Sequence, residues 1–139
     1  PGLAEVYINL TGVNLKKGNL ETAEKYSREG LRTAEEISVP QAIAHAWNKV
    51  GMVQQQKKDW REAITSFSKA AEIADKANMT LAIAEANRCT GEVLIEMGNR
   101  DQAKTSLQKA LEIYKKIKSI DNIELTQQSL SKLGKHLPN

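Results

Sequence analysis

The sequence predicts an all-α solenoid, in which antiparallel helix pairs stack side by side, and three observations support this fold. Small and large residues recur in a fixed order at intervals of 40 residues. Apolar residues within each interval follow helical spacing. Gly, Asn, Asp and Pro interrupt the apolar stripes where helices must end. A unit of this size cannot bury its apolar face alone, so neighbouring units must stack.

The repeat is clearest in the middle of the chain, between residues 44 and 71. Its order there is Trp47, Val50, Gly51, Ala63, Phe67 and Ala70. The frame returns 40 residues later as Ala84, Thr90, Gly91, Ala103, Leu107 and Ala110, and 40 residues earlier as Ala4, Tyr7, Leu10, Ala23 and Gly30. We therefore expect repeats at about residues 4–39, 40–79 and 80–119, within one domain spanning residues 3–138.

The first helix pair is expected on either side of Gly18. One helix runs from Leu3 to about Lys17, and Asn19 then offers an N-cap for a second helix that reaches about Ile37. Gly30 inside the second helix costs up to about 1 kcal/mol relative to alanine. We expect another backbone to approach Gly30 closely.

The second pair begins after the break at Ser38, Val39 and Pro40, because proline fits the first turn of a helix better than its interior. A helix over about residues 40–57 follows. Asp59 with Glu62 three residues later forms a capping-box pattern for the fourth helix. That helix carries an apolar stripe from Trp60 through Phe67 to Ala74.

The third pair is expected between Thr80 and Ser119, with Gly98 and Asn99 dividing its two helices as Gly18 and Asn19 divide the first pair. A seventh helix at about residues 121–137 begins with Asp121 and Glu124. Its apolar stripe is narrow and its remaining surface polar, as a solenoid needs in order to cap its last unit. Nothing comparable covers the first helix. Together with the absence of an initiator Met, this indicates a piece of a longer protein.

The residue order resembles the tetratricopeptide repeat, whose units have a large residue, a small pair, a tight turn and a small-large-small series ending in alanine. The resemblance implies a right-handed α-solenoid of three helix pairs plus a C-terminal capping helix. The 40-residue period exceeds the usual length of about 34. Similar long-helix forms occur in Leu-Gly-Asn-type polarity adaptors, kinesin light chains and the peptide-sensing domains of some bacterial regulators.

Composition narrows the class of partner and the compartment. The 20 basic and 17 acidic residues are spread along the chain, and aromatic residues make up 4%, which disfavours nucleic-acid binding. No apolar run is long enough to span a bilayer, and no signal peptide is visible. One cysteine permits no disulfide framework. We expect a cytoplasmic protein with no membrane association.

No catalytic, metal or cofactor motif is visible in the sequence. His45, His136 and Cys89 lack metal-ligand spacing, and the glycines fall at repeat positions that turns or helix contacts explain. Trp47 and Trp60 occupy bulky slots of the repeat, so packing explains them better than partner binding does. We therefore expect no enzyme activity, no metal and no cofactor.

The resemblance implies that the first helix of each pair lines a concave groove that binds a protein or peptide. The groove-facing residues would be Ile8, Asn9, Gly12, His45, Asn48, Lys49, Met52, Glu85, Arg88, Cys89, Glu92, Leu125, Gln128, Ser129 and Lys132. The family's carboxylate clamp is disfavoured, because its cation slots hold Ile8, Gly12, Glu85 and Cys89. Ile8, Asn48, Arg88 and Gln128 share one register, which predicts a polar row for a peptide backbone.

Three functional hypotheses remain at this point. The leading one is a non-enzymatic interaction module that binds a peptide or protein segment in its groove. The second is a ligand- or peptide-sensing domain of a larger transcription regulator or enzyme. The third is self-association through the uncovered first helix. For Arg88, an ion pair along its own helix with Glu85 or Glu92 is as plausible as a ligand contact.

Overall fold

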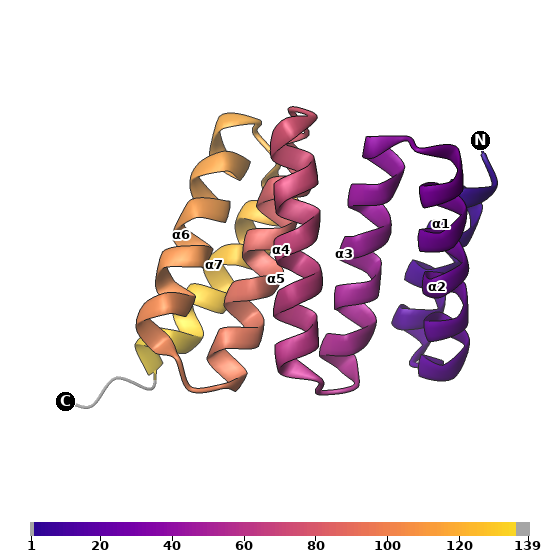
Figure 1. Ribbon diagram of the computed structural model, residues 1–139. Coiled ribbons are helices and arrows are strands. Elements are labelled where there is room, and N and C mark those ends of the chain that lie inside the picture. The colour runs from indigo at the N-terminus through magenta and orange to yellow at the C-terminus, as the bar shows by residue number, and fades with distance from the viewer. Residues whose placement is uncertain (1, 136–139) are drawn as a thin grey trace.

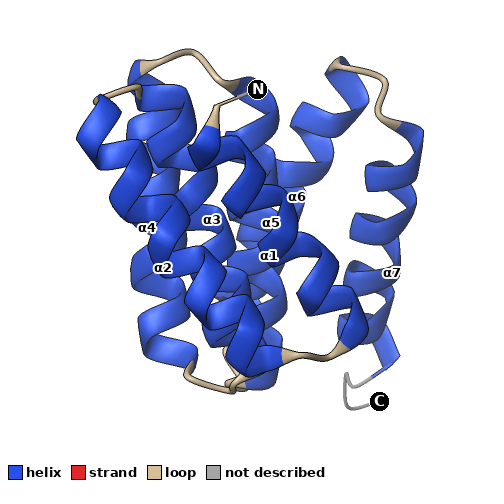
Figure 2. Cartoon of the chain, turned by 90° about the vertical axis from the view of Figure 1, so that its right-hand side faces the viewer, coloured by secondary structure: helices blue, strands red, loops and turns tan. Residues whose placement is uncertain are grey.

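The computed structural model describes residues 2–135, and over this range it contains seven helices and no strand (Figure 1, Figure 2). The predicted all-α class is therefore confirmed. The helices are α1 Leu3–Lys17, α2 Leu20–Ile37, α3 Pro40–Gln56, α4 Trp60–Lys76, α5 Thr80–Glu96, α6 Arg100–Lys116 and α7 Ile120–Lys135. The last helix begins one residue before the predicted start, and the predicted end at residue 137 lies outside the described residues.

The helices stack as antiparallel pairs, and the contacts between them show how the array of pairs curves. The most extensive contacts join α1 to α2, α3 to α4 and α5 to α6, and each second helix also packs on the next first helix. The first helices contact one another in series, from α1 to α3 to α5 to α7, whereas no contact joins α2 to α4 or α4 to α6 within the described chain. The array therefore curves with its first helices on the inside.

The turns between helices divide each 40-residue repeat into two equal halves. A residue with positive φ occurs at every twentieth position: Gly18, Ser38, Lys58, Asn78, Gly98 and Lys118. After five of these six, the next backbone N–H donates to the carbonyl five residues earlier, as in Asn19 to Asn14 and Asp59 to Gln54. These bonds satisfy carbonyls at the helix end, as in a Schellman motif.

The predicted side-chain caps do not form. Asn19 and Asp59 are the N-cap residues of α2 and α4, but neither side chain makes a capping hydrogen bond. The capping-box prediction for Asp59 and Glu62 is therefore wrong. The short turns hold these residues at ψ near 75° and bring their backbone N–H groups onto the preceding helix, so the helix boundaries are set by the backbone.

Glycines allow the two helices of a pair to come close, as their repeat positions predict. A Cβ atom on Gly30 of α2 would lie 3.3 Å from Cβ of Tyr7 and 3.6 Å from the backbone nitrogen of Ile8. This confirms the close approach of α1 to Gly30. In the middle repeat, a Cβ on Gly51 would lie 2.6 Å from the Phe67 ring. A larger residue at Gly51 would require the Phe67 ring or the helix pair to shift, whereas at Gly30 the neighbouring atoms would have to give only slightly.

The two ends of the solenoid differ in polarity. Leu130 and Leu133 of α7 pack against α6, while Glu124, Gln127 and Ser131, at the positions where other first helices meet their own second helix, are exposed. This polar face is that of a capping helix. At the other end α1 exposes Val6 (40%) and Val13 (47%), although the equivalent residues of α3 and α5 are buried.

Candidate functional site

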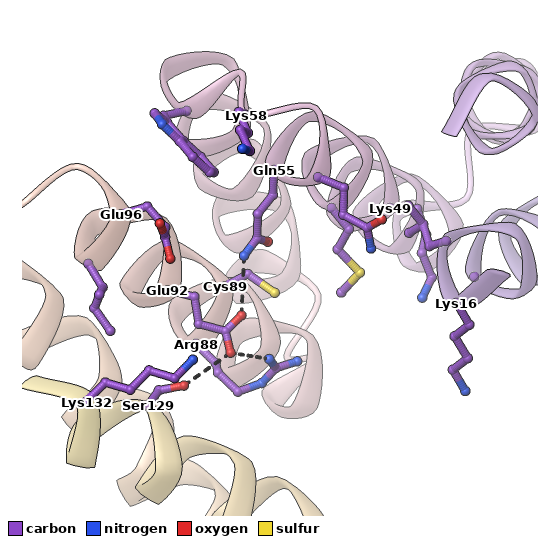
Figure 3. A pocket seen from close by; sticks show the side chains of 16 residues that line it. Lys16, Lys49, Gln55, Lys58, Arg88, Cys89, Glu92, Glu96, Ser129 and Lys132 are labelled. Carbon is purple, nitrogen blue, oxygen red and sulfur yellow. Dashed lines mark hydrogen bonds and ion pairs between the residues drawn. The ribbon is translucent and has the colours of Figure 1, made fainter. Parts of the chain in front are cut away.

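The concave side carries two hollows, each lined mainly by first helices. The larger has a volume of about 690 Å³ and lies between the C-terminal halves of α1, α3 and α5, with α7 on its far side (Figure 3). The smaller, of about 510 Å³, lies between the N-terminal halves of α1, α3 and α5. Lys49 of α3 lines both, so the two hollows are neighbouring parts of one groove.

Most of the predicted groove residues lie in these hollows. The larger contains Gly12, Lys49, Met52, Arg88, Cys89, Glu92, Ser129 and Lys132, and the smaller contains Ile8, Asn9, His45 and Glu85. Leu125 and Gln128 are exposed on α7 but line neither hollow. Twelve of the fifteen predicted residues therefore line the two hollows.

Asn48 is the clear exception, because the structure buries it completely. Its amide Nδ2 donates to the backbone carbonyl of Ala82 at 3.3 Å, so it ties α3 to α5. The prediction that Asn48 belongs to an exposed polar row is wrong. Neighbouring first helices pack closely enough at this register that α5 covers the side chain.

Arg88, the next residue of that predicted row, is held in an ion pair. Its Nη1 lies 3.0 Å from Oε2 of Glu92, one helical turn away, and its side chain is only 13% exposed. The i,i+4 pairing anticipated from the sequence therefore forms. With Asn48 buried and Ile8 apolar, the row of equivalent residues does not present a ladder of amides.

Glu92 connects three first helices across the floor of the larger hollow. Besides Arg88, its carboxylate accepts hydrogen bonds from Nε2 of Gln55 on α3 at 3.4 Å and from Oγ of Ser129 on α7 at 3.3 Å (Figure 3). Three donors use much of the hydrogen-bonding capacity of this carboxylate, so it is not free to bind a ligand. Glu92 therefore shapes the groove by fixing α3 and α7 relative to α5.

Several residues of the larger hollow were not predicted from the sequence, among them Lys16, Gln55, Gln56, Lys58 and Trp60. Lys16 and Gln56 stand one helical turn beyond Gly12 and Met52, and the same repeat frame extended by that turn would have found them. Lys58 occupies a turn, where a helical frame gives no information. Trp60 contributes both to the hollow and to the core around Phe67, so packing explains part of its surface.

Cys89 lies at the floor of the hollow but is 2% exposed. Burial raises the pKa of its thiol far above the usual range. A thiol in this state remains protonated at neutral pH and is a poor nucleophile. Cys89 therefore serves as a small apolar core residue.

The described part of the chain contains no candidate metal site and no candidate membrane-spanning helix. No group of three or more His, Cys, Asp or Glu side chains there could hold a metal ion. None of the described helices combines the length and apolarity needed to cross a membrane.

Comparison with known proteins identifies the repeat. The sequence pattern of the tetratricopeptide repeat matches residues 42–116, more than half of the chain. This chain belongs to the tetratricopeptide repeat family. Members of the family are helical repeats that mediate protein interactions, and the matched residues cover nearly all of the pairs α3–α4 and α5–α6. No curated protein matches the sequence.

Solved structures share the fold at low sequence identity. The apo form of RapI superposes with a TM-score of 0.83 at 21% identity, covering 94% of this chain and 47% of RapI. BtubC (BKLC) from P. vanneervenii superposes with a TM-score of 0.67 at 15% identity, covering 99% of this chain and 64% of BtubC. The chain thus spans less than two thirds of either protein, and the similarity concerns the helical repeat fold alone.

Proposed function

We propose that this tetratricopeptide repeat chain is a non-enzymatic interaction module that binds a peptide segment of another protein in its concave groove. The observation that carries the proposal is the continuous groove formed by the two hollows, which share Lys49 and extend over four first helices. A groove of that extent suits an extended chain better than a compact small molecule.

The groove also has the mixed character that peptide recognition requires. The larger hollow combines apolar surface from Leu15, Met52 and Ile95 with charged side chains around it. The smaller combines Ile8 and Leu81 with Asn9, His45 and Gln41. Apolar surface supplies affinity, while amide and charged groups satisfy the backbone and polar side chains of the bound segment.

Gly12 provides a way to block the groove without disturbing the core. A Cβ atom added there would meet only the end of the Lys49 side chain, at 3.6 Å. A Gly12→Phe substitution therefore places a ring in the larger hollow. Ser68→Phe is the matched control, because Ser68 is exposed on α4, on the outer side of the array.

The experiment selects binders from a phage-displayed library of random peptides on the immobilised protein and measures their affinity by isothermal titration calorimetry. We expect Gly12→Phe to reduce affinity at least about tenfold, a loss of about 1.4 kcal/mol, and Ser68→Phe to leave it unchanged. Equal affinity for both variants would show that peptides bind elsewhere and would refute the proposal.

A second candidate function, self-association through α1, rests on a separate observation. Leu3, Val6 and Val13 form an exposed apolar stripe at positions whose counterparts on α3 and α5 pack against a preceding helix. Sedimentation velocity of the chain beside a Val6→Glu, Val13→Glu double variant tests it. Self-association requires an oligomer that the double variant loses, and a monomer at all concentrations would exclude it.

A further inference from the structure

Cationic side chains gather at the larger hollow in excess of acidic ones. Its lining includes the cations Lys16, Lys49, Lys58, Arg88 and Lys132, which come from α1, α3, the α3–α4 turn, α5 and α7 (Figure 3). Two acidic residues, Glu92 and Glu96, line the same hollow. The whole chain has a formal net charge of +3, so this local excess is a concentrated feature of the molecule.

The four lysines of the larger hollow carry charges that no described carboxylate neutralises, a property that they share with some lysines of the second helices, such as Lys25, Lys104 and Lys109. On the second helices, Arg28, Arg32, Lys76 and Lys116 each pair with a glutamate one turn away. Within the described part of the chain, Lys16, Lys49, Lys58 and Lys132 form no ion pair. The charge of Glu92 is balanced by Arg88, with which it forms an ion pair, so it leaves the charges of the four lysines uncompensated.

Apolar surface lies between these lysines. Leu15, Met52, Trp60, Cys89 and Ile95 contribute to the same hollow from α1, α3, α4 and α5. Lys49 itself lies against α1, its Nζ being 3.6 Å from the position that a Cβ on Gly12 would occupy. An ammonium group held at the edge of an apolar surface interacts with a carboxylate more strongly than one surrounded by water.

The smaller hollow has the opposite charge character. Glu5 and Glu85 line it, and Lys49, at its border with the larger hollow, is its one lysine. A bound segment therefore meets acidic groups beside the N-terminal halves of the first helices and cationic groups beside their C-terminal halves. Such a field discriminates against a segment that carries its charges in the reverse arrangement.

We propose that the larger hollow is a subsite for acidic peptide side chains, which accepts an apolar residue on its floor and one or more flanking Asp or Glu carboxylates at Lys49 and Lys132. This inference rests on the proposed peptide-binding function and names the chemistry of the segment bound. The ligand group is a side-chain carboxylate, and a free C-terminus is not required. Lys16 and Lys58 add to the positive potential at the rim of the hollow.

The first test uses the peptides selected from the random phage-displayed library. We expect Asp or Glu beside an apolar residue to be enriched in those whose binding Gly12→Phe abolishes. One such peptide, acetylated and amidated at its ends, is compared with a counterpart in which Gln and Asn replace Glu and Asp. The acidic form should bind at least about tenfold more tightly at low salt, and the difference should shrink at high salt.

Protein variants assign the effect to particular lysines. Lys49→Gln and Lys132→Gln should each reduce the affinity for the acidic peptide at least about threefold and leave that for the amide counterpart unchanged. Lys76→Gln and Lys116→Gln remove the same charge from the outer surface and should alter neither affinity. All four lysines are at least partly exposed, and folding of each variant is checked by circular dichroism.

The possible failures can be told apart. If peptides bind in the groove, as judged by Gly12→Phe, but the acidic and amide forms bind equally, this inference is refuted and the proposed function stands. If only a free C-terminal carboxylate restores binding, the side-chain subsite is refuted in favour of a terminal clamp. If no selected peptide depends on the groove, the proposed function and this inference fall together.

Discussion

Gly51 of α3 lies directly against the ring of Phe67 on α4: a Cβ atom at Gly51 would stand 2.6 Å from Cε1 of that ring. Phe67 is completely buried in a cluster with Ala63, Ala86 and Val93, so a shift of its ring would disturb packed neighbours. The same relation recurs one repeat later, where a Cβ on Gly91 would lie 2.6 Å from Cγ of Leu107. Contact between paired helices thus depends on the absence of a side chain.

We expect Gly51→Ala to destabilise the protein by about 1 to 3 kcal/mol, because overpacking outweighs the gain in helix propensity of up to about 1 kcal/mol. Gly12→Ala is the matched control on α1, since its Cβ would meet only the flexible end of Lys49. It should be neutral or stabilising. Urea denaturation of both variants measures the difference, and equal midpoints would contradict the close contact at Gly51.

The left-handed turns make a second prediction about glycine. Gly98 has φ of +83° and nothing within 4 Å of the position that a Cβ atom would occupy, whereas Gly134 of α7 has the same open space without a positive φ. Gly98→Ala should therefore cost about 1 kcal/mol through backbone strain alone. Gly134→Ala should add up to about 1 kcal/mol of stability through helix propensity. Midpoint temperatures of thermal unfolding that shift in the same direction for Gly98→Ala and Gly134→Ala would contradict this explanation.

Asn48→Ala should act on stability and not directly on binding. It removes the hydrogen bond to the Ala82 carbonyl and leaves a cavity between α3 and α5, at an expected cost of about 1 to 3 kcal/mol. Gln128→Ala is the comparison, because Gln128 is exposed and should leave the denaturation midpoint unchanged. An unaltered midpoint for Asn48→Ala would contradict a stabilising role for the hydrogen bond to the Ala82 carbonyl.

Cys89 should make the stability of the protein fall as pH rises into the alkaline range. Burial raises the pKa of its thiol in the folded state, so the unfolded chain loses this proton at a lower pH than the folded chain does. The contribution of the buried thiol to the free energy of unfolding is complete below its pKa in the unfolded chain, about 8.5, and declines as pH rises above that value. We expect the stability of the wild type to fall more steeply above that pH than the stability of Cys89→Ala. Parallel pH profiles would contradict the burial of the thiol.

The burial of Cys89 also predicts that its thiol is alkylated slowly at neutral pH. Alkylation by iodoacetamide should be rapid in denaturant and at least about a hundredfold slower in the native protein, because both access and ionisation are suppressed. Fast labelling of the native protein would place Cys89 on an open face of the groove.

The amino-acid sequence by itself determined the helices, their pairing and the side of each first helix that faces the groove. These features depend on local spacing: small residues such as Ala63 and Gly91 recur at a fixed period, and a helix places residues of equal register on equal faces. For the same reason Gly30 could be assigned to a close helix contact before its partner was known.

The tertiary structure alone decided which groove residues remain accessible. Asn48, Arg88 and Gln128 share one register, yet the first is buried under α5, the second is paired with Glu92 and the third is exposed on α7. The accessibility of these three side chains depends on how closely successive first helices approach one another. That distance is set by packing between repeats and cannot be deduced from the repeat period. The gathering of Lys16, Lys58 and Lys132 around one hollow has the same origin, since these residues are far apart in sequence and meet only because the stacked repeats curve.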